Sequence, residues 1–344
     1  MQTERSSCSG VRLVFLARLR WIALGTAVVL LAGWALAAPA SAAAKEQPAT
    51  KDKEKAEIPK PEDLELTTGD GLELTLTYYP GAKGKESIPI VLLHMWKQSR
   101  NDYKELAPAL QALGYAVIVP DLRGHGESTH LKGARKDETL DAATMSPQQF
   151  TAMVNRDMKA IKTFLWERNN AGELNMDKLC VVGAEMGASV ALNFALTDAL
   201  DQDRNRVLRT DYKLGRFVKA LVLISPPRSF RGLPLKQATA YPAVQRDIAM
   251  LILVGNKNPK ALEDAKRIHG LFEKFHPEPT GDDKAKLDRK TLFFGSLNTS
   301  LQGTKLLDPK FDVASIIADF VHRRLERSEE SRDWTWKERK VPHE

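Results

Sequence analysis

One short segment carries residue types at a spacing that could do chemistry. Residues 183–187 read Gly-Ala-Glu-Met-Gly; they follow an apolar run, residues 179–182, and precede an alanine-rich stretch typical of a helix. In a Gly-x-Ser-x-Gly turn between a strand and a helix, backbone strain exposes the serine hydroxyl above the sheet as a nucleophile. Here both glycines keep their spacing and the central residue is Glu185. The segment therefore predicts the turn, with a carboxylate in place of the hydroxyl.

The elements that must position this turn are apolar strands alternating with helices. Residues 64–68 and 72–79 alternate apolar and polar side chains around a Gly-Asp-Gly turn, which predicts an antiparallel hairpin. Continuous apolar runs then predict strands at residues 88–94, 115–121, 179–183, 218–225, 249–255 and 290–295. Helical patterns lie at residues 102–113, 147–168, 187–199, 259–275 and 311–325. Buried strands alternating with helices predict an α/β fold, with a mostly parallel sheet covered by helices on both faces.

The order of these landmarks resembles the α/β-hydrolase superfamily, in particular its serine-aminopeptidase and lysophospholipase branch, over residues 64–325. Five segments carry the resemblance: the loop that supplies an oxyanion-hole amide, the loop after the next strand, the nucleophile elbow, the acid loop and the base loop. They are VLLHMW (91–96), PDLRGHGES (120–128), VVGAEMGASVAL (181–192), LILVGNKNP (251–259) and LNTSLQGTKLL (297–307). The resemblance implies an α/β-hydrolase fold. Because residues 225–246 are few and proline-rich, we expect a minimal lid over its crevice.

The same resemblance assigns the three triad positions to Glu185, Asn258 and Gln302. A serine hydroxyl needs an imidazole to accept its proton and a carboxylate to hold that imidazole. Gln302 stands in the base position, and an amide has no useful basicity. Asn258 stands in the acid position and carries no charge. The substitutions favour a hydrolase-fold protein without catalysis, a pseudoenzyme that acts by binding.

An active hydrolase of small esters or amides that uses non-standard residues such as Glu185 is the alternative. Related hydrolases of halides and epoxides use an aspartate at the elbow. A glutamate there could form an ester, but a water activated by a histidine would have to hydrolyse it. His94 ends a predicted strand and is the histidine that we expect nearest to Glu185. Ser189 lies one helical turn beyond Glu185 and is expected to point into the helix packing.

Without catalysis, the crevice remains a candidate binding pocket lined by His94, Met95, Trp96, Glu185 and Met186. A helix N-terminus favours a negative charge, so Glu185 could cap the helix or accept bonds from the Met186 amide and the loop at Met95 and Trp96. Alternatively it could select a cationic or hydroxyl-bearing small molecule, or a protein. No cluster of His, Cys, Asp and Glu has metal-ligand spacing, and we expect neither a metal nor a cofactor.

The N-terminal segment predicts export to the periplasm or the cell exterior. Four arginines precede an uncharged apolar run at residues 21–38, and a small-residue cleavage site follows it. An uncleaved membrane anchor at residues 21–38 is the alternative. We therefore expect a signal peptide, a charged proline-containing linker, one hydrolase-like domain and a charged tail, with bounds 1–42, 43–62, 63–326 and 327–344.

Charge and cysteine content argue against a nucleic-acid-binding protein and against a disulfide within the exported chain. Residues 1–42 hold four arginines and one glutamate, so the formal net charge falls from +7 to +4 once they are removed. The remaining lysines are interspersed with acids, which speaks against a basic stripe for nucleic acid. Cys180 is the single cysteine after the leader, so no disulfide can form within the exported chain. Trp334 and Trp336, in the tail, are candidates for a docking segment.

Overall fold

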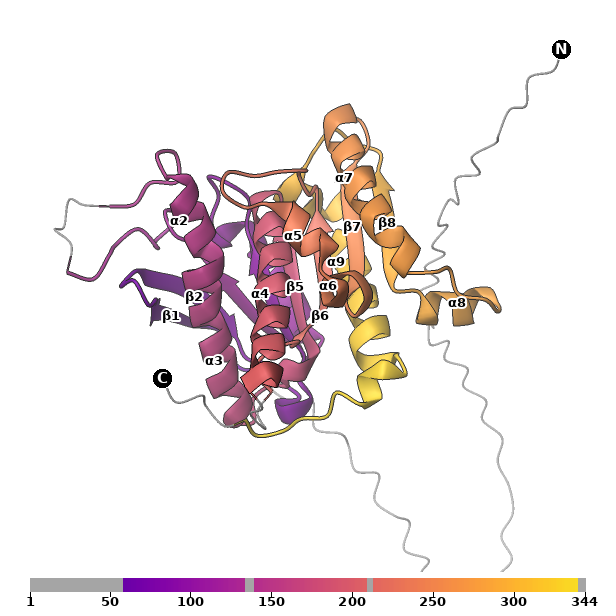
Figure 1. Ribbon diagram of the computed structural model, residues 1–344, viewed down its shortest axis with the longest axis horizontal. Helices are drawn as coiled ribbons and strands as arrows, with labels where there is room; N and C mark the ends of the chain where they lie inside the picture. The colour runs from indigo at the N-terminus through magenta and orange to yellow at the C-terminus, as the bar shows by residue number, and fades with distance from the viewer. Residues whose placement is uncertain (1–57, 134–138, 209–212, 340–344) are drawn as a thin grey trace, which may run out of the picture. The chain divides into compact units, whose positions relative to one another are not determined.

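The computed structural model describes residues 58–133, 139–208 and 213–339. Its centre is an eight-stranded sheet in the order β1-β2-β4-β3-β5-β6-β7-β8 (Figure 1). β1 pairs antiparallel with β2 and β2 antiparallel with β4, whereas every later pair is parallel. The strands are β1 (Glu62–Thr67), β2 (Glu73–Tyr79), β3 (Pro89–Leu93), β4 (Ala116–Pro120), β5 (Leu179–Ala184), β6 (Val218–Ile224), β7 (Ala249–Gly255) and β8 (Leu292–Leu297). The predicted mostly parallel sheet with an antiparallel N-terminal hairpin is confirmed.

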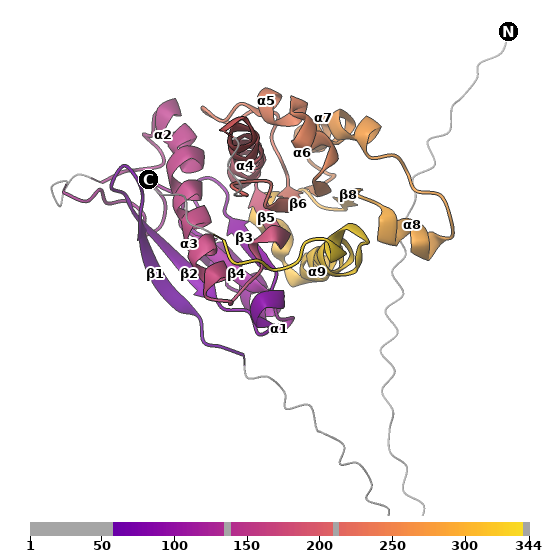
Figure 2. The ribbon, with the colours of Figure 1, turned by 60° about the horizontal axis from the view of Figure 1, so that its bottom comes forward.

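Helices cover both faces of the sheet (Figure 2). One face packs against α3, α4 and α7 in an apolar cluster that includes Leu165, Val190 and Ile268. The other face packs against α1 and α9 through side chains such as Leu110 and Ile317. The helices are α1 (Leu106–Ala112), α2 (Pro147–Ala152), α3 (Met158–Asn170), α4 (Met186–Leu208), α5 (Leu235–Ala240), α6 (Pro242–Arg246), α7 (Pro259–Phe272), α8 (Asp283–Arg289) and α9 (Val313–Val321).

The helices differ from the sequence pattern in local detail. The predicted helix over residues 147–168 is divided into α2 and α3 by a π-helical turn, Met153–Asp157. Short helices α5, α6 and α8 were not predicted, because one or two turns show too little periodicity to detect. Two of them have clear start signals: Pro242 opens α6, and the side chain of Asp282 caps α8.

The strand order determines where loops from distant parts of the sequence meet. β3 lies between β4 and β5, and Leu93 at its end pairs with Gly183 of β5. The chain leaves β3 toward one side of the sheet and returns through β5 on the other. Crevices in such sheets form outside the carboxyl ends of the strands at this reversal. The loops after β3 and β5 are therefore adjacent at the carboxyl edge.

The sequence makes predictions for both ends of the chain. The predicted leader, residues 1–42, and most of the linker, residues 43–57, lie outside the described residues. Among the described helices, none combines the length and apolarity needed to cross a bilayer. In the predicted tail, residues 328–339 pack against the domain: Asn175 donates to the Trp334 carbonyl at 2.8 Å and the Trp336 indole donates to the Asn169 carbonyl at 3.0 Å.

Candidate functional site

The turn at Glu185 has the geometry that its glycines require. Glu185 lies between the end of β5 and the start of α4 and has a φ of 46°, in the left-handed region. A Cβ on Gly183 would lie 2.3 Å from the Gly187 carbonyl oxygen, and one on Gly187 would lie 2.2 Å from the Leu93 carbonyl oxygen. Real Cβ atoms are not found so close to backbone oxygens, so glycine is needed at both positions. The structure therefore has a strand–turn–helix elbow with a glutamate at its apex.

The Glu185 side chain points toward the loop that follows β8. A Cβ on Gly303 would lie 3.2 Å from Glu185 Oε1 and 2.6 Å from Met95 Sδ, so these three residues are in contact range. Burial raises the pKa of the Glu185 carboxyl, and the positive charge of Lys305 partly opposes this shift. Among the described residues, none donates a hydrogen bond to this carboxylate. The structure thus lacks the bonds from Met186 and the loop at residues 95–96 that the oxyanion-hole interpretation required.

Gln302 has both ends of its amide bonded to the protein. Its Nε2 donates to the Gly255 carbonyl at 2.9 Å, and its Oε1 accepts from the Ser225 hydroxyl at 2.7 Å. The same hydroxyl oxygen accepts the Gly303 amide at 3.0 Å. Ser225 follows β6 directly and has a φ of 50°, which turns its side chain into this network. Gln302 therefore anchors its own loop to the ends of β6 and β7.

Asn258 serves as a helix cap. Its side-chain oxygen accepts the Ala261 amide at 3.1 Å, and Pro259 occupies the first position of α7. This arrangement satisfies one of the free amides at the helix start. The neighbouring Lys257 amide donates to the Thr299 carbonyl at 2.9 Å, so the loops after β7 and β8 run side by side. The structure brings these two loops and Glu185 to one sheet edge, but the Asn258 side chain is directed to its own helix.

His94 is fully buried and has no exposed surface in the crevice. Its Nε2 accepts the Leu122 amide at 3.0 Å, so its Nδ1 carries the proton and donates to the Met95 carbonyl at 2.8 Å. Burial, and secondly the ring of His125 at 4.9 Å, lowers the pKa of His94 to about 3. Burial also lowers the pKa of His125. Both rings brace loops, and neither is bonded to Glu185.

The other pocket candidates differ in how far they reach solvent. Met186 is fully buried and Met95 is 8% exposed, so neither offers a ligand much surface. Trp96 is half-buried, donates its indole proton to the Ala142 carbonyl at 3.1 Å, and has the Arg231 guanidinium 4.5 Å from its ring centroid. Glu185 and Trp96 are therefore the two candidates whose side chains a ligand could contact.

Ser225 and Lys305 were missed by the sequence reasoning, although both influence the site. Ser225 offered one signal, because it is a polar residue at the end of an apolar strand and precedes two prolines. Lys305 offered none, because its proximity to Glu185 depends on how the loop after β8 folds back.

Comparison with known proteins agrees with this topology. The family model for the alpha/beta hydrolase fold matches residues 88–271, more than half of the chain. The chain belongs to the α/β-hydrolase fold family. The serine-aminopeptidase and lysophospholipase branch remains a prediction, since the match concerns the superfamily.

Individual α/β-hydrolase relatives are distant. A soluble epoxide hydrolase from Corynebacterium sp. (strain C12) is 34% identical over 107 residues, which is 31% of this chain and 29% of that protein. An esterase from Pyrococcus furiosus superposes with a TM-score of 0.51 at 16% identity, over 77% of this chain and 91% of that chain. A protein from Agrobacterium vitis superposes with a TM-score of 0.50 at 14% identity, over 76% of this chain and 100% of that chain. The two structural likenesses show the fold alone.

Proposed function

We propose that this α/β-hydrolase-fold protein has lost catalysis and acts by binding a ligand or a protein at the carboxyl edge of its sheet. The observation that carries the proposal is the bonding of Gln302. In the base position implied by the family resemblance, its amide is held by Ser225 and Gly255 and has no basic nitrogen. Neither His94 nor His125 is bonded to Glu185, so neither is placed to act as its general base.

The chemistry of Glu185 suggests the class of ligand. Its carboxylate is half-buried and has no hydrogen-bond donor among the described residues. A buried acceptor without a hydrogen bond is energetically unfavourable. A ligand that donates a hydrogen bond to this carboxylate would therefore be bound favourably. The ring of Trp96 is half-buried and belongs to the same loop as Met95, which lies in contact range of the Gly303 position beside Glu185. A small cationic or hydroxyl-bearing molecule, or a protein side chain of that chemistry, fits these features best.

A panel of small esters and amides, together with a fluorophosphonate probe, tests the loss of catalysis on the purified chain. We expect no turnover and no covalent labelling. Turnover that Glu185→Gln abolishes and Ser189→Ala leaves intact would overturn the proposal, because it would make Glu185 a working nucleophile. Labelling of any serine would overturn it as well, since the probe reports an activated hydroxyl.

Restoring the triad tests whether only side chains were lost. Glu185→Ser, Asn258→Asp and Gln302→His together should give weak esterase activity, and Glu185→Ser alone almost none, because the triad acts as a unit. Met95→Gly should improve the triple variant, since Met95 crowds the loop at Gly303. A folded quadruple variant that fluorophosphonate does not label would show that the oxyanion site has also changed, which favours a scaffold remodelled for binding.

A carboxylate nucleophile is the second candidate function, favoured by the unbonded Glu185 carboxylate and by the relative named an epoxide hydrolase. A carboxylate oxygen of Glu185 would attack an epoxide carbon; the carbon–oxygen bond would open and the alkoxide would take a proton from water. The resulting ester would then require base-assisted hydrolysis. Incubation with styrene oxide, followed by intact-mass measurement, distinguishes the cases. Diol formation with turnover, or a stable adduct on Glu185, supports this candidate, and an unmodified chain without diol eliminates it.

Export is part of the proposal, and it rests on the arginines, the apolar run and the small residues of the first 42 positions. We propose cleavage after Ala42 and release into the periplasm or the cell exterior. The mass of the protein recovered from a cell-envelope fraction checks this. A mature chain beginning at Ala43 is expected, whereas a full-length chain that remains in the membrane pellet would support the anchor at residues 21–38.

A further inference from the structure

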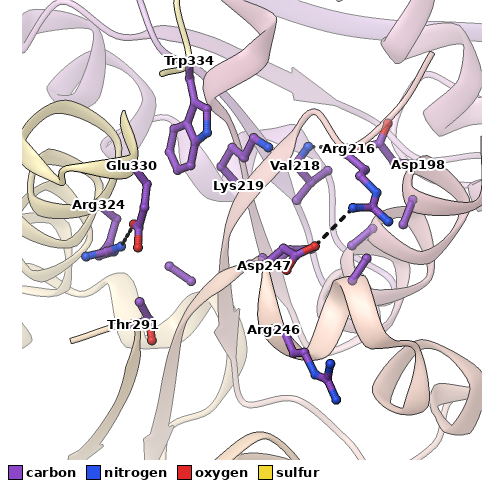
Figure 3. Close-up of a pocket in the computed structure, with 15 residues that line it drawn as sticks. Asp198, Arg216, Val218, Lys219, Arg246, Asp247, Thr291, Arg324, Glu330 and Trp334 are labelled. Atoms are coloured by element: carbon purple, nitrogen blue, oxygen red, sulfur yellow. Dashed lines mark hydrogen bonds and ion pairs between the residues drawn. The ribbon is translucent and has the colours of Figure 1, made fainter. Parts of the chain in front are cut away.

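A cavity of about 340 Å³ lies at the edge of the sheet opposite Glu185. Its lining includes Val218 and Ala249, which begin β6 and β7, and Thr291, which precedes β8. These are the amino ends of parallel strands, whereas Glu185 follows the carboxyl end of β5. Figure 3 shows the cavity between these strand ends and the C-terminal segment that carries Glu330 and Trp334. The volume lies within the range of small-molecule sites in proteins.

The acidic side chains that line the cavity are already neutralised. Each has a basic partner within salt-bridge distance, so none presents an unbalanced negative charge to a ligand. The pairs are Asp198 with Lys162 at 2.9 Å, Asp247 with Arg216 at 3.5 Å, and Glu330 with Arg324 at 2.5 Å. Arg246, at the exposed rim, adds a positive charge and contacts the Phe275 ring at 5.6 Å. The lining therefore has an excess of positive charge.

Lys219 lacks an acidic partner among the described residues, as does Arg246 at the exposed rim, but Lys219 is the more buried of the two. Its Nζ lies 5.0 Å from the centroid of the Trp334 ring, and among the described residues it makes no hydrogen bond or ion pair. Burial, and secondly the charge of Lys213, lowers the pKa of Lys219 to about 8, while Asp177, Asp198 and Asp247 oppose the shift. A half-buried ammonium without a counter-ion is stabilised by an anion placed beside it.

The rest of the lining is largely apolar. Ala195 and Ala199 of α4 and Val218 of β6 line the cavity, as does Trp334, which packs against the apolar cluster on the opposite face of the sheet from Ala195 and Val218. A fully hydrated inorganic ion would gain nothing from these surfaces, whereas a planar apolar group would be removed from water against them. The site therefore matches a molecule with one charged end and one apolar end.

The C-terminal segment holds Trp334 in place before any ligand arrives. Its carbonyl accepts from Asn175 at 2.8 Å, and the following Trp336 is bonded to Asn169 and lies under the Lys85 ammonium at 3.7 Å. The Arg339 guanidinium is paired with Asp177. These contacts fix the segment at several points, so the cavity wall is pre-formed and binding requires little ordering.

We propose that this cavity binds a small organic anion, with its carboxylate or phosphate group on Lys219 and a planar apolar body against the ring of Trp334. The site is independent of the crevice at Glu185 and does not rest on the function proposed there. No residue of the carboxyl edge takes part in it.

Benzoate is a suitable probe, with acetate as the isolated head group and benzamide as the isolated body. Saturation-transfer NMR titrations on the full chain should show benzoate binding about tenfold more tightly than acetate or benzamide. Lys219→Gln should weaken benzoate binding about tenfold, and Lys219→Arg should largely preserve it. Lys284→Gln, on the exposed face of α8, is the matched control and should have no effect. Circular dichroism establishes that each variant is folded.

A second measurement uses the unaltered chain. Pyridoxal phosphate carries an anionic group on a planar ring, and its aldehyde condenses with an uncharged lysine amine to give an imine and water. After borohydride reduction, peptide mass analysis at pH 8 should find Lys219 labelled far more than Lys284, with benzoate protecting it. Equal labelling of the two lysines, or absence of protection, would overturn the site. If benzamide binds as tightly as benzoate, the proposed contact between an anionic group and Lys219 is wrong. If acetate binds as tightly as benzoate, the proposed contact between an apolar body and Trp334 is wrong.

Discussion

The elbow around Glu185 and the loop around Gln302 lie at the same edge of the sheet, but different forces hold them. The elbow is fixed by backbone contact: Gly183 and Gly187 each face a carbonyl oxygen at a distance that admits no side chain. The Gln302 loop is fixed by side-chain hydrogen bonds to Ser225 and Gly255. The geometry of the elbow does not depend on which side chain residue 185 carries. The arrangement of the second loop depends on the Gln302 side chain itself.

Under the proposed loss of catalysis, this difference would explain how the elbow persists without a triad. A glutamate at the apex leaves the glycine contacts unchanged, so the strand–turn–helix geometry remains. Gln302 and Asn258, in contrast, have structural tasks in their own loops. We expect removal of these two side chains, at the base and acid positions that the resemblance implies, to cost stability rather than activity.

The largest effect is expected from filling the elbow. Gly187→Ala places a Cβ 2.2 Å from the Leu93 carbonyl oxygen, where only a shift of β3 or α4 can relieve the overlap. We expect a loss of roughly 3 kcal/mol in the free energy of unfolding, at the upper end of overpacking effects. Urea unfolding measures this. Gly270→Ala in α7 is the control: a Cβ there meets nothing within 4 Å, and alanine should stabilise that helix by about 0.5–1 kcal/mol.

A smaller loss is expected from the Gln302 loop. Gln302→Ala removes the hydrogen bonds to the Ser225 hydroxyl and the Gly255 carbonyl, together with a longer one to the Ser300 carbonyl at 3.4 Å. We expect a destabilisation of about 2 kcal/mol. Ser300→Ala, an exposed position in the same loop, should change stability by less than about 0.5 kcal/mol. Equal effects of the two substitutions would show that the side-chain hydrogen bonds of Gln302 do not hold the loop.

Removal of the Asn258 cap should have a moderate effect. Asn258→Ala leaves the Ala261 amide unsatisfied, and we expect a loss of about 1 kcal/mol. Asn258→Asp should be nearly neutral, because aspartate caps helices equally well. Thermal unfolding of the two variants distinguishes them. A large loss with aspartate would indicate that a negative charge is unfavourable here and would weaken the restoration experiment.

The smallest effect is expected from the charge of Glu185. Burial raises the pKa of its carboxyl, so the stability contributed by protonation is present below the unfolded pKa and is lost as pH rises through the folded pKa. Glu185→Gln, which cannot ionise, should therefore be more stable than the parent at pH 7 by up to about 0.5 kcal/mol. The advantage should disappear below about pH 4. Glu105→Gln, at an exposed position, is the control for urea unfolding at both pH values. If the stability advantage of Glu185→Gln grows as the pH is lowered, the pKa of Glu185 is not raised in the folded protein.

The sequence by itself determined the scaffold. Alternating and continuous apolar runs located every strand of the sheet among the described residues. This is possible because the burial of a strand determines which of its own side chains are apolar. The Gly-x-x-x-Gly spacing located the elbow, because only glycine avoids the backbone overlap there. The position of His94 at a strand end was also evident, but not its burial or its bonds to the Leu122 amide and the Met95 carbonyl.

Tertiary structure alone decided what these residues do. Gln302 meets Ser225 across 77 positions of sequence, and Lys219 meets Trp334 across a still longer separation. Such pairs depend on which strand ends lie side by side and on the path of the C-terminal segment, which local patterns do not encode. The charge balance of the cavity at the amino edge likewise follows from partners contributed by separate elements. A lysine in a strand is unremarkable in sequence, and it becomes a candidate anion site only when folding buries it without an acidic partner.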